Sequence, residues 1–513
     1  MIRLGIDVGG THTDAVVMND STVVGTHKAA TSTDVATGIV AAAEAVRADC
    51  GLPRSAIDAV IIGTTQFTNA IVQRRGLAPV FALRVGAQST AALPPFCDWP
   101  ADLRAAVRGG VAMIDGGHEY DGKPIRPLDE TALGDAYAAL GAARLESLAV
   151  CSVFSFVNPA IESRIYAEVR RRSLVPHISL SGELGGVGIH QRENATLLNA
   201  ALRPMAQQVL AAYRDALKKL GLPARLFISQ NDGTLMDAGF AARYPVLTIS
   251  SGPTNSMRGA AHLTGLADAM VIDVGGTTSD IGMLAGGVPR RSGGEVTVGG
   301  VATNFRMPDV LSIGLGGGSK VTPDGRTVGP VSVGHELARR ALCFGGDVLT
   351  ATDVAHASGL ASFGSRGREL RLDPGMVRNA MVTIESAFAA AVDRMKITPA
   401  DLPLIAVGGA AFLVPEKLAG VSRVVRPHYA QVANAVGAAM AKVGAEAEVV
   451  YTRGNDNRDT ALERARHDAT AKAVAAGASR ETIEITDVDE VPISYLDEPV
   501  VRLRIRAVGE MQL

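Results

Sequence analysis

A chain of 513 residues with a net charge of only −2 offers no basic surface for nucleic acid, and its length predicts two to four domains with large cores. Hydrophobic residues make up 47% of the sequence but aromatic residues only 4%, so the cores must be packed with aliphatic side chains. The four cysteines stand far apart and form no CxxC pair, which excludes the usual zinc-ribbon and iron–sulfur patterns and indicates a reducing compartment.

The distribution of apolar residues bears on the location of the protein. No apolar run reaches membrane-spanning length without a polar interruption. The first residues already have the pattern of a strand, which leaves no room for a signal peptide. We therefore expect a cytoplasmic protein that has neither nucleic acid nor a membrane among its partners.

An apolar strand opens the chain at residues 4–8 and turns at two glycines into a second strand. Glycine lacks a Cβ and adopts positive φ readily, so its backbone N–H groups can approach a phosphate. Carboxylates cannot contact phosphate directly and instead hold a hydrated divalent cation or a reacting water. This hairpin therefore predicts a phosphate site at Gly9, Gly10, Thr11, His12 and Thr13, flanked by Asp7 and Asp14.

The next buried strand, residues 59–62, ends in polar residues and leads into a helix. The carboxyl ends of strands are where open α/β sheets bind ligands. This pattern makes Gly63, Thr64, Thr65 and Asn69 candidate substrate contacts. The alternative is that a threonine only caps the helix and that Asn69 lies within it.

Three later segments have a functional and a structural interpretation. Residues 93–100 hold the only tryptophan among three prolines and predict an irregular loop, either a lid or a packed surface loop. His118 and Glu119 either ligate a metal ion or simply occupy a turn. Residues 191–220 predict a long helix that Pro204 kinks or splits.

The pattern of the first hairpin returns about half the chain later. An apolar strand at residues 270–274 carries Asp273, turns at Gly275, Gly276, Thr277 and Thr278, and continues to Asp280. One such hairpin is often only a tight turn. Two of them predict a nucleotide that is held between two related halves.

The remaining sequence contains two glycine-rich turns and then a change in residue pattern. Asp309 precedes Gly316, Gly317 and Gly318, which form either another ligand loop or a plain bend, and Gly408 and Gly409 offer a flat backbone surface for an adenine or ribose. From about residue 447 a charged helix and alternating strands predict a small α+β tail. We expect an α/β protein with halves at residues 1–185 and 186–446 and this tail at 447–513.

Several phrases together resemble the hydantoinase A/5-oxoprolinase family of the actin, sugar-kinase and chaperone-ATPase fold superfamily. They are Asp7-Val-Gly-Gly-Thr11, Gly63-Thr-Thr65, Ser155-Phe-Val-Asn-Pro159, Ser251-Gly-Pro253, the second hairpin from Asp273 to Asp280, and Gly316-Gly-Gly-Ser319. The resemblance implies two ribonuclease H-like halves around a nucleotide cleft, with Gly408 and Gly409 in the adenosine motif. It further implies two helices that connect the halves, one at residues 434–439 and the other near residues 194–201.

The family resemblance implies the ATP-dependent opening of a cyclic amide or imide, such as a hydantoin, 5-oxoproline or a lactam, by phosphoryl activation of the amide oxygen. In that scheme the threonines and glycines of both hairpins hold the phosphates, Asp7 and Asp273 organise Mg²⁺, and Asp14 or Asp280 orients or deprotonates the water. Gly316, Gly317 and Gly318 join the ATP site. Gly63, Thr64, Thr65, Asn69 and Asp309 lie on the substrate side.

Alternatives remain open at this point. A small-molecule kinase would share both hairpins, and so would the ATP-binding subunit of a multi-subunit hydrolase or carboxylase. The resemblance also implies a second, hydantoinase B-like subunit and a homo- or hetero-oligomer. Arg74 stands where the family often has Glu, and Thr254-Asn255-Ser256 replaces a run of alanine and glycines, so the substrate stays open.

Overall fold

The computed structural model describes residues 1–513 except 10–11, 31–34, 295, 364–369, 455–457, 495 and 497. Its largest sheet has nine strands in the order β22-β23-β21-β10-β9-β4-β1-β2-β3. The strands are β1 (Ile2–Val8), β2 (His12–Asn19), β3 (Thr22–Ala30), β4 (Ala59–Thr64), β9 (Arg225–Ser229), β10 (Leu235–Asp237), β21 (Val443–Thr452), β22 (Glu484–Pro492) and β23 (Val500–Gly509). Because β1, β4 and β9 are parallel, their carboxyl ends lie at one edge of the sheet.

The C-terminal residues extend this sheet, which differs from the separate unit expected at 447–513. β21 pairs with β10 at Leu235 and Val443, and β23 pairs with β21 along its whole length. Helix α14 (Arg458–Ala475) covers β21 and β23 with four buried alanines, Ala461, Ala465, Ala469 and Ala473. Backbone pairing thus carries the sheet of the first half into the tail. β9 and β10 also belong to this sheet, although residues 186–446 were expected to form the other half.

A four-stranded parallel sheet follows the order β6-β5-β7-β8, with β5 (Val80–Val85), β6 (Arg108–Ile114), β7 (Ser147–Ser152) and β8 (His177–Leu180). Helices α4 (Glu130–Ala143) and α5 (Ala160–Arg171) share a hydrophobic core with these strands. Helix α7 (Ile189–Lys219) packs on β7 and β8, and it contains Pro204 as one uninterrupted helix rather than two. The buried Arg84 on β5 fixes α7 through an ion pair with Glu193, with Nε donating to Oε1 at 2.7 Å.

The second half is built on a six-stranded sheet that repeats the start of the first. The order is β13-β12-β11-β19-β20, with β16 beside β12. Its strands are β11 (Ala269–Val274), β12 (Ser279–Ala285), β13 (Val288–Pro289), β16 (Val310–Ile313), β19 (Leu404–Val407) and β20 (Val424–Val425), and α12 (Pro374–Met395) packs on them. In both halves a hairpin is followed by a parallel neighbour, β4 beside β1 and β19 beside β11.

Two closely packed helices join the halves. α9 (Ser251–Thr264) lies on β11, β12 and β19, whereas α13 (Ala433–Met440) lies on β1, β2 and β4. A Cβ on Gly259 would lie 1.9 Å from the carbonyl oxygen of Ala433, and a Cβ on Gly437 would lie 1.9 Å from that of Asn255. Only glycine permits this approach. The second connecting helix is therefore α9, not residues 194–201, which lie within α7.

The other elements are short, apart from α1. They are α1 (Val35–Asp49), α2 (Gln66–Gln73), α3 (Ala101–Val107), α6 (Ser181–Leu184), α8 (Ala238–Arg243), α10 (Leu337–Arg340), α11 (Ala351–Ala357), β14 (Val296–Val298), β15 (Val301–Thr303), β17 (Ser319–Val321) and β18 (Val328–Ser332). None of the helices that the structure describes is long and apolar enough to cross a membrane.

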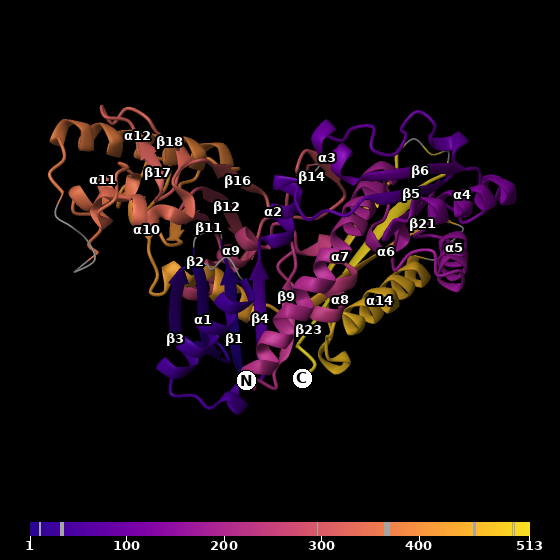
Figure 1. The fold of residues 1–513 in the computed structure, drawn as a ribbon, viewed down its shortest axis with the longest axis horizontal. Helices are drawn as coiled ribbons and strands as arrows, with labels where there is room; N and C mark the ends of the chain where they lie inside the picture. The colour runs from indigo at the N-terminus through magenta and orange to yellow at the C-terminus, as the bar shows by residue number, and fades with distance from the viewer. Residues whose placement is uncertain are drawn as a thin grey trace.

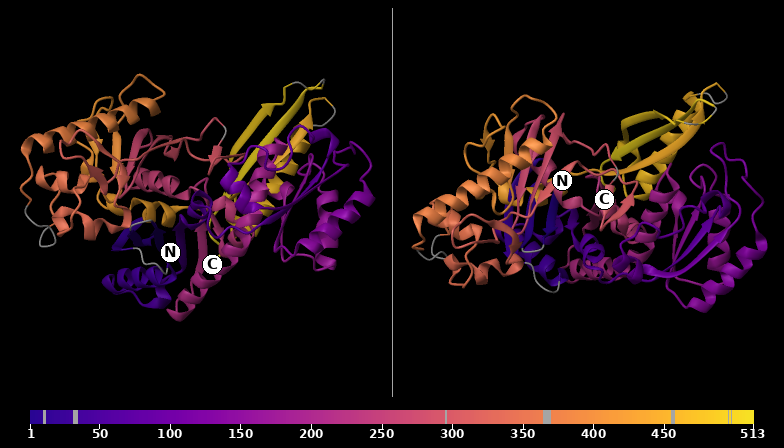
Figure 2. Two further views of the ribbon diagram at one scale, coloured as in Figure 1. Left: turned by 45° about the horizontal axis from the view of Figure 1, so that its top comes forward. Right: turned by 90° about the horizontal axis from the view of Figure 1, so that it is seen from above.

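The arrangement in space follows from these pairings. Figure 1 shows α10, α11 and α12 at one end of the molecule, α4 and α5 at the other, and β1–β4 between them. Both views in Figure 2 place the yellow C-terminal strands on the side of the purple four-stranded sheet, away from the orange helices. The two termini lie close together, and Arg3 pairs with Glu510 at 3.1 Å.

Candidate functional site

The two predicted hairpins have the same backbone geometry. Asp7 is paired with Asp14 across the first hairpin, and Asp273 with Asp280 across the second. Each turn is closed by one hydrogen bond from its first glycine, Gly9 N–H to His12 O at 3.0 Å and Gly275 N–H to Thr278 O at 2.9 Å. Thr277 and Thr278 are exposed at the second tip, whereas Thr13 is buried. Gly10 and Thr11, also predicted to bind phosphate, lie outside the described residues.

Each aspartate on a first strand faces a glycine on the neighbouring parallel strand. A Cβ on Gly63 would lie 2.7 Å from Asp7 Oδ1, and a Cβ on Gly408 would lie 2.2 Å from Asp273 Oδ1. Any larger residue would occupy the space beside the carboxylate. Gly63 was predicted to contact the substrate and Gly408 the nucleotide. In the structure each of them leaves space for the neighbouring aspartate carboxylate.

Two side chains on the connecting helices link the carboxylates of the two halves. Asn434 on α13 donates from Nδ2 to Asp7 Oδ2 at 3.3 Å. Its amide oxygen contacts the hydroxyl of Ser256 on α9, which also contacts the carboxylate of Asp273. Sequence reasoning assigned no role to Asn434 or Ser256. Two features of the sequence could have identified them: Asn434 lies in a predicted connecting helix, and Ser256 lies in a segment that departs from the family pattern.

A lysine from the first half lies between the hairpins. Lys28 is opposite Asp14 in the pairing of β2 with β3, and its Nζ lies 2.6 Å from Asp14 Oδ1. It also donates to the carbonyl oxygen of Gln431 at 3.3 Å, and a Cβ on Gly409 would lie 3.6 Å from Nζ. Lys28 therefore brings a positive charge against Gly409 of the predicted adenosine motif. Sequence reasoning missed it because its position depends on strand register.

Burial and mutual repulsion hold these carboxylates in an unusual state. Burial, reinforced by the charges of Asp14 and Asp273, raises the pKa of Asp7 from 3.8 to about 7, while the hydrogen bond from Asn434 opposes this rise. Burial also raises the pKa of Asp14 and of Asp273, opposed chiefly by Lys28 and by Ser256 respectively. At Asp280, burial raises the pKa to about 6 against the hydrogen bond from Ser312. Such pKa shifts are typical of a functional site in which a bound positive charge would stabilise the ionised carboxylates.

The loop of three glycines supports the second hairpin. Gly317 N–H donates to Gly275 O at 3.0 Å, and Gly318 N–H donates to Gly276 O at 2.7 Å. Gly316 N–H donates to Ser319 Oγ at 2.9 Å. The backbone donors of this loop are therefore used within the protein, and phosphate binding by Gly316, Gly317 and Gly318 stays a prediction.

The predicted substrate residues fall into two places. Thr65 Oγ1 donates to Val8 O at 3.3 Å, and Asn69 Nδ2 donates to Thr65 Oγ1 at 3.4 Å, so these residues lie beside the end of β1. Thr64 is buried and its Oγ1 accepts from the backbone of Gln66 at 3.2 Å, whereas the N-cap of α2 is Thr65, which makes no side-chain capping bond. Asp309 is ion-paired with Arg290 at the end of β16 away from the hairpin. The structure does not bring Asp309 together with the Gly63–Asn69 group.

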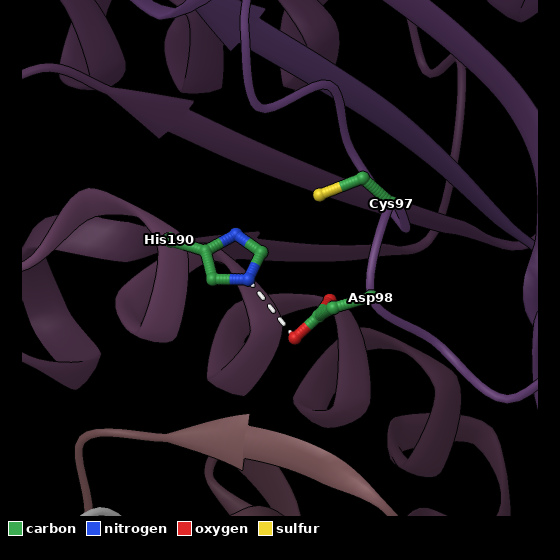
Figure 3. Close-up of side chains that lie close together, drawn as sticks. All are labelled: Cys97, Asp98 and His190. Carbon is green, nitrogen blue, oxygen red and sulfur yellow. Dashed lines mark ion pairs between the residues drawn. The ribbon is translucent and has the colours of Figure 1, made fainter.

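The proline-rich loop at residues 93–100 is fastened to α7, as the packed-loop interpretation requires. His190 Nε2 lies 2.9 Å from Asp98 Oδ2, and Cys97 points toward the same imidazole (Figure 3). One potential metal ligand from each of Cys97, Asp98 and His190 lies within 4.8 Å of the others. Trp99 Nε1 donates to Asn194 Oδ1 at 2.8 Å. These polar contacts account for the position of the loop without a ligand.

The predicted metal pair at His118 and Glu119 has no such partner. Among the described residues the one potential metal-ligand cluster is that of Cys97, Asp98 and His190. His118 is buried in a short bridge to Pro124, and the backbone of Glu119 closes the turn with Lys123 at 2.8 Å. The turn interpretation accounts for both residues.

Comparison with known proteins agrees with this geometry. The family model for the hydantoinase/oxoprolinase N-terminal region matches residues 3–173, and the model for hydantoinase/oxoprolinase matches residues 192–362. The chain is 27% identical to the acetophenone carboxylase gamma subunit of Aromatoleum aromaticum over 386 residues, which cover 68% of this chain and 52% of that protein. It is 26% identical to the caprolactamase subunit alpha of Pseudomonas jessenii over 481 residues, which cover 81% of this chain and 66% of that protein.

Solved structures show the same fold. The ATP-dependent caprolactamase from Pseudomonas jessenii superposes with a TM-score of 0.79 at 22% identity, and nucleotide-free acetone carboxylase with a TM-score of 0.70 at 18% identity. Each comparison covers 99% of this chain and 88% of the other. The chain spans about half to two thirds of the length of the curated relatives it matches. Together the two family models cover most of the sequence, and the chain belongs to the hydantoinase/oxoprolinase family.

Proposed function

We propose that this chain binds ATP between its two hairpins and uses it to open a cyclic amide or imide of the hydantoin, 5-oxoproline or lactam type. One observation carries this proposal: Asp7 and Asp273, one from each half, are joined through Asn434 and Ser256. Two equivalent carboxylates in one polar chain are suited to a ligand that spans both halves. The names of the relatives, which include an ATP-dependent caprolactamase, support the same substrate class.

The chemistry explains why ATP is needed. The carbonyl carbon of a ring amide is a poor electrophile, and its nitrogen is a poor leaving group. Transfer of the γ-phosphoryl group to the amide oxygen releases ADP and gives a phosphorylated imidate. Water then adds to the carbon, and the ring C–N bond breaks as the nitrogen takes a proton, which leaves an acyl phosphate. A second water hydrolyses the acyl phosphate to the ring-opened acid and phosphate. The protein needs positioning and charge stabilisation more than a nucleophile.

The residues of the hairpins divide into phosphate ligands and cation ligands. The hydroxyls of Thr277 and Thr278, exposed beside Gly275 and Gly276, are placed to hold phosphate oxygens, with His12 at the equivalent turn of the first half. Asp7 and Asp273 would hold Mg²⁺, because buried carboxylate oxygens, whose pKa is raised by burial and further by neighbouring carboxylates, suit a hard divalent cation. When bound, this ion neutralises negative charge on the phosphates.

Asp280 is the better of the two candidate bases for water. Asp14 is committed to an ion pair with Lys28, which favours its ionised form and weakens it as a base. Asp280 has a pKa of about 6 and a hydrogen bond from Ser312 that fixes its orientation. A general base acts best when its pKa lies near the working pH. We assign to Asp280 the removal of a proton from the attacking water. Asp14 positions Lys28.

The first test is phosphate release from Mg·ATP, alone and with hydantoin, 5-oxoproline, 2-pyrrolidinone and caprolactam. Release that one ring amide stimulates, together with formation of the ring-opened acid and loss of both in Asp7→Asn and Asp273→Asn, is the expected result. Release without ring opening, accompanied by a stable phosphate ester, would instead identify a small-molecule kinase. Absence of ATP binding would overturn the proposal altogether.

A second candidate function is that of the ATP-binding subunit of a multi-subunit hydrolase or carboxylase. It is favoured by the relatives, whose names describe subunits. The two functions differ in what the isolated chain does. Tight ATP binding without turnover, followed by turnover after addition of a hydantoinase B-like subunit, would select the subunit role.

A further inference from the structure

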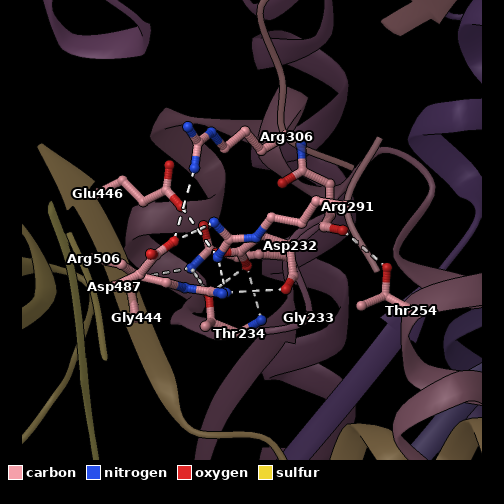
Figure 4. A network of polar contacts seen from close by, with 12 residues as sticks. Asp232, Gly233, Thr234, Thr254, Arg291, Arg306, Gly444, Glu446, Asp487 and Arg506 are labelled. Carbon is pink, nitrogen blue, oxygen red and sulfur yellow. Dashed lines mark hydrogen bonds and ion pairs between the residues drawn. The ribbon is translucent and has the colours of Figure 1, made fainter. Parts of the chain in front are cut away.

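A cavity lies at the carboxyl edge of the nine-stranded sheet, beyond the end of β9. Its volume is about 400 Å³, within the range of about 300–1,000 Å³ that small-molecule sites occupy. Its walls come from the end of β9, the start of β21, the turn between α6 and α7, the segment after β15, and α14. Figure 4 shows one wall, where Arg291 and Arg306 of the second half reach Glu446 on β21 and Asp487 on β22.

Two amide side chains that line the cavity carry unused hydrogen-bonding groups. Asn231 follows β9 and is only 5% exposed, yet its Nδ2 has no hydrogen-bond partner within the described part of the chain. The Oδ1 of Asn304, which follows β15, is likewise buried and unpartnered among these residues. Buried polar atoms nearly always have partners, and leaving one without a partner is destabilising. A donor and an acceptor in one cavity indicate a ligand that presents the complementary pair.

The backbone holds Asn231 and Asn304 in these positions. Asn231 N–H donates to Leu247 O at 2.7 Å, and Asn231 O accepts from Thr254 Oγ1 at 2.9 Å. A Cβ on Gly185 would lie 1.9 Å from Asn304 Nδ2, so only glycine there lets Asn304 approach. A Cβ on Gly186 would likewise lie 1.8 Å from Glu448 Oε1. These two glycines therefore form part of the cavity wall.

Two of the charges on the cavity wall are held in ion pairs. Arg504 holds Glu448 at 2.6 Å, and Arg506 holds Asp232 at 2.5 Å. Lys472 is partly buried, and its largest favourable charge interaction is with Asp468, one turn away on α14. Aromatic and aliphatic side chains, Phe156, Phe240, Leu247 and Phe305, complete the lining. The lining carries more acidic than basic side chains, and Glu446 Oε1 is a further buried acceptor without a hydrogen-bond partner among the described residues, so the cavity suits a neutral polar molecule better than an anion.

Three successive residues of α9 connect the cavity to the ATP site. Thr254 holds Asn231, Ser256 contacts Asp273, and Asn255 between them donates to Ser229 Oγ at 3.2 Å. A Cβ on Gly63, which faces Asp7, would lie 3.1 Å from Asn255 Nδ2. β9 is the second strand from β1, and neighbouring strands lie about 4.8 Å apart, so Ser229 at the end of β9 is about 10 Å from Asp7 across the sheet. Asn231 lies two residues beyond Ser229.

We propose that this cavity is the substrate pocket and that it binds the ring amide through Asn231 and Asn304; this rests on the proposed function. In a cyclic amide the C=O and N–H groups point to the same side, so one molecule meets both asparagines. Asn231 Nδ2 donates to the carbonyl oxygen, and Asn304 Oδ1 accepts from the ring N–H. As the amide oxygen gains a phosphoryl group, positive charge develops on the ring nitrogen. The acceptor at Asn304 stabilises that charge more than it stabilises the bound substrate.

The test measures ring-amide binding directly, by saturation-transfer NMR with a non-hydrolysable ATP analogue present. The probes are hydantoin, 5-oxoproline, 2-pyrrolidinone and caprolactam, with the N-methylated form of whichever binds. Asn231→Leu and Asn304→Leu, which keep side-chain size and remove the polar atoms, are compared with Asn379→Ala on the exposed face of α12 as a matched control. Affinity for the ATP analogue is measured in every variant as a check on folding.

We expect a loss of at least tenfold in ring-amide affinity in each pocket variant, unchanged affinity for the ATP analogue, and weak binding of the N-methylated ligand. Ring-amide binding that survives both leucine substitutions would overturn the pocket assignment, even if phosphate release in the wild type still upheld the proposed function. Failure of every ring amide to bind the wild type would overturn it too. Asparagine-dependent binding without stimulated phosphate release would uphold the pocket and refute the proposed function.

Discussion

Asn434 donates its side-chain N–H to Asp7 across 427 residues of sequence, at a distance of 3.3 Å. The donor lies on α13, and the acceptor lies on β1, under the first hairpin. A hydrogen bond to the charged form of a carboxyl group lowers its pKa. This contact is therefore the main interaction that keeps Asp7 from becoming still harder to ionise. It also ties the position of α13 to the charge state of the site.

Replacing this asparagine should shift the pH dependence of nucleotide binding. Asn434→Ala removes the hydrogen bond, so the pKa of Asp7 rises above its value of about 7. Mg·ATP requires the ionised carboxylate, and its affinity in the variant should fall near pH 7 and recover toward pH 8.5. Titrating affinity against pH with a fluorescent ATP analogue measures the midpoint. Asn379→Ala serves as the control, and an unchanged midpoint in Asn434→Ala would show that the contact does not tune Asp7.

The raised pKa of Asp7 also predicts a pH-dependent cost to stability. The unfolded chain ionises Asp7 near pH 3.8, whereas the folded protein keeps the proton until about pH 7. Between these values the native state binds more protons, so the free energy of unfolding falls as the pH rises. Asp7→Asn removes this loss. Without nucleotide or Mg²⁺ it should gain stability relative to wild type between pH 4 and 7, to an upper limit of about 4 kcal/mol, and show no further gain above pH 7.

Urea unfolding at pH 4, 5.5, 7 and 8.5 measures that difference. The pH 4 value is the internal control, because it lies close to the unfolded-state pKa of 3.8, so little of the stability difference has developed there. A stability difference between wild type and Asp7→Asn that stays constant across the series would mean that Asp7 ionises normally. It would also remove the electrostatic reason for assigning a cation to this carboxylate.

How much of this site could be predicted from sequence depended on how local each feature is. Both hairpins were predicted because Asp7 and Asp273 each precede a Gly-Gly turn at the same spacing, and that signal is contained in about ten residues. The fold followed from the same repeat. Lys28 was not predicted because nothing in its neighbourhood marks it. Its contact with Asp14 arises from the register of β2 on β3.

The tail and the cavity were missed for a similar reason. A strand such as β21 has the same alternating pattern whether it pairs within its own unit or with a distant sheet, and its pairing with β10 is fixed by three-dimensional packing. The cavity draws Asn231 and Asn304 from segments some 70 residues apart, and both are asparagines in unremarkable sequence. Gly185 and Gly186 could be recognised as a glycine-rich turn. The side chains that require glycine there, Asn304 and Glu448, are distant in the sequence.

The ion pair between Lys28 and Asp14 yields a prediction in the form of a double-mutant cycle. Lys28→Met leaves the buried carboxylate of Asp14 without its 2.6 Å partner and should cost about 1–3 kcal/mol of stability, less than a fully buried pair because Lys28 is 30% exposed. Asp14→Asn removes the unpaired charge, so the double variant should recover most of that loss. Thermal or urea unfolding of the four proteins gives the coupling energy. Additive effects would place Lys28 and Asp14 in separate roles.

The close approach of α9 and α13 gives the sharpest packing prediction. In Gly437→Ala the new Cβ would lie 1.9 Å from the carbonyl oxygen of Asn255, on backbone that cannot move without shifting Ser256 away from Asp273. We expect a loss of at least about 3 kcal/mol in the free energy of unfolding, because an overlap with backbone is not relieved by rotating a side chain. Any protein that still folds should bind ATP more weakly, since the two carboxylates lose their common scaffold.

Gly134→Ala on α4 is the matched control for this substitution. The new Cβ there meets nothing within 4 Å, and the helix interior favours alanine by about 0.5–1 kcal/mol. Gly134→Ala should therefore be neutral or slightly stabilising and leave ATP affinity unchanged. A Gly437→Ala protein as stable as Gly134→Ala, with normal ATP affinity, would show that α9 and α13 do not approach as closely as their backbones indicate. The alignment of Asp7 with Asp273 would then need another cause, because their link runs through Asn434 and Ser256 on these two helices.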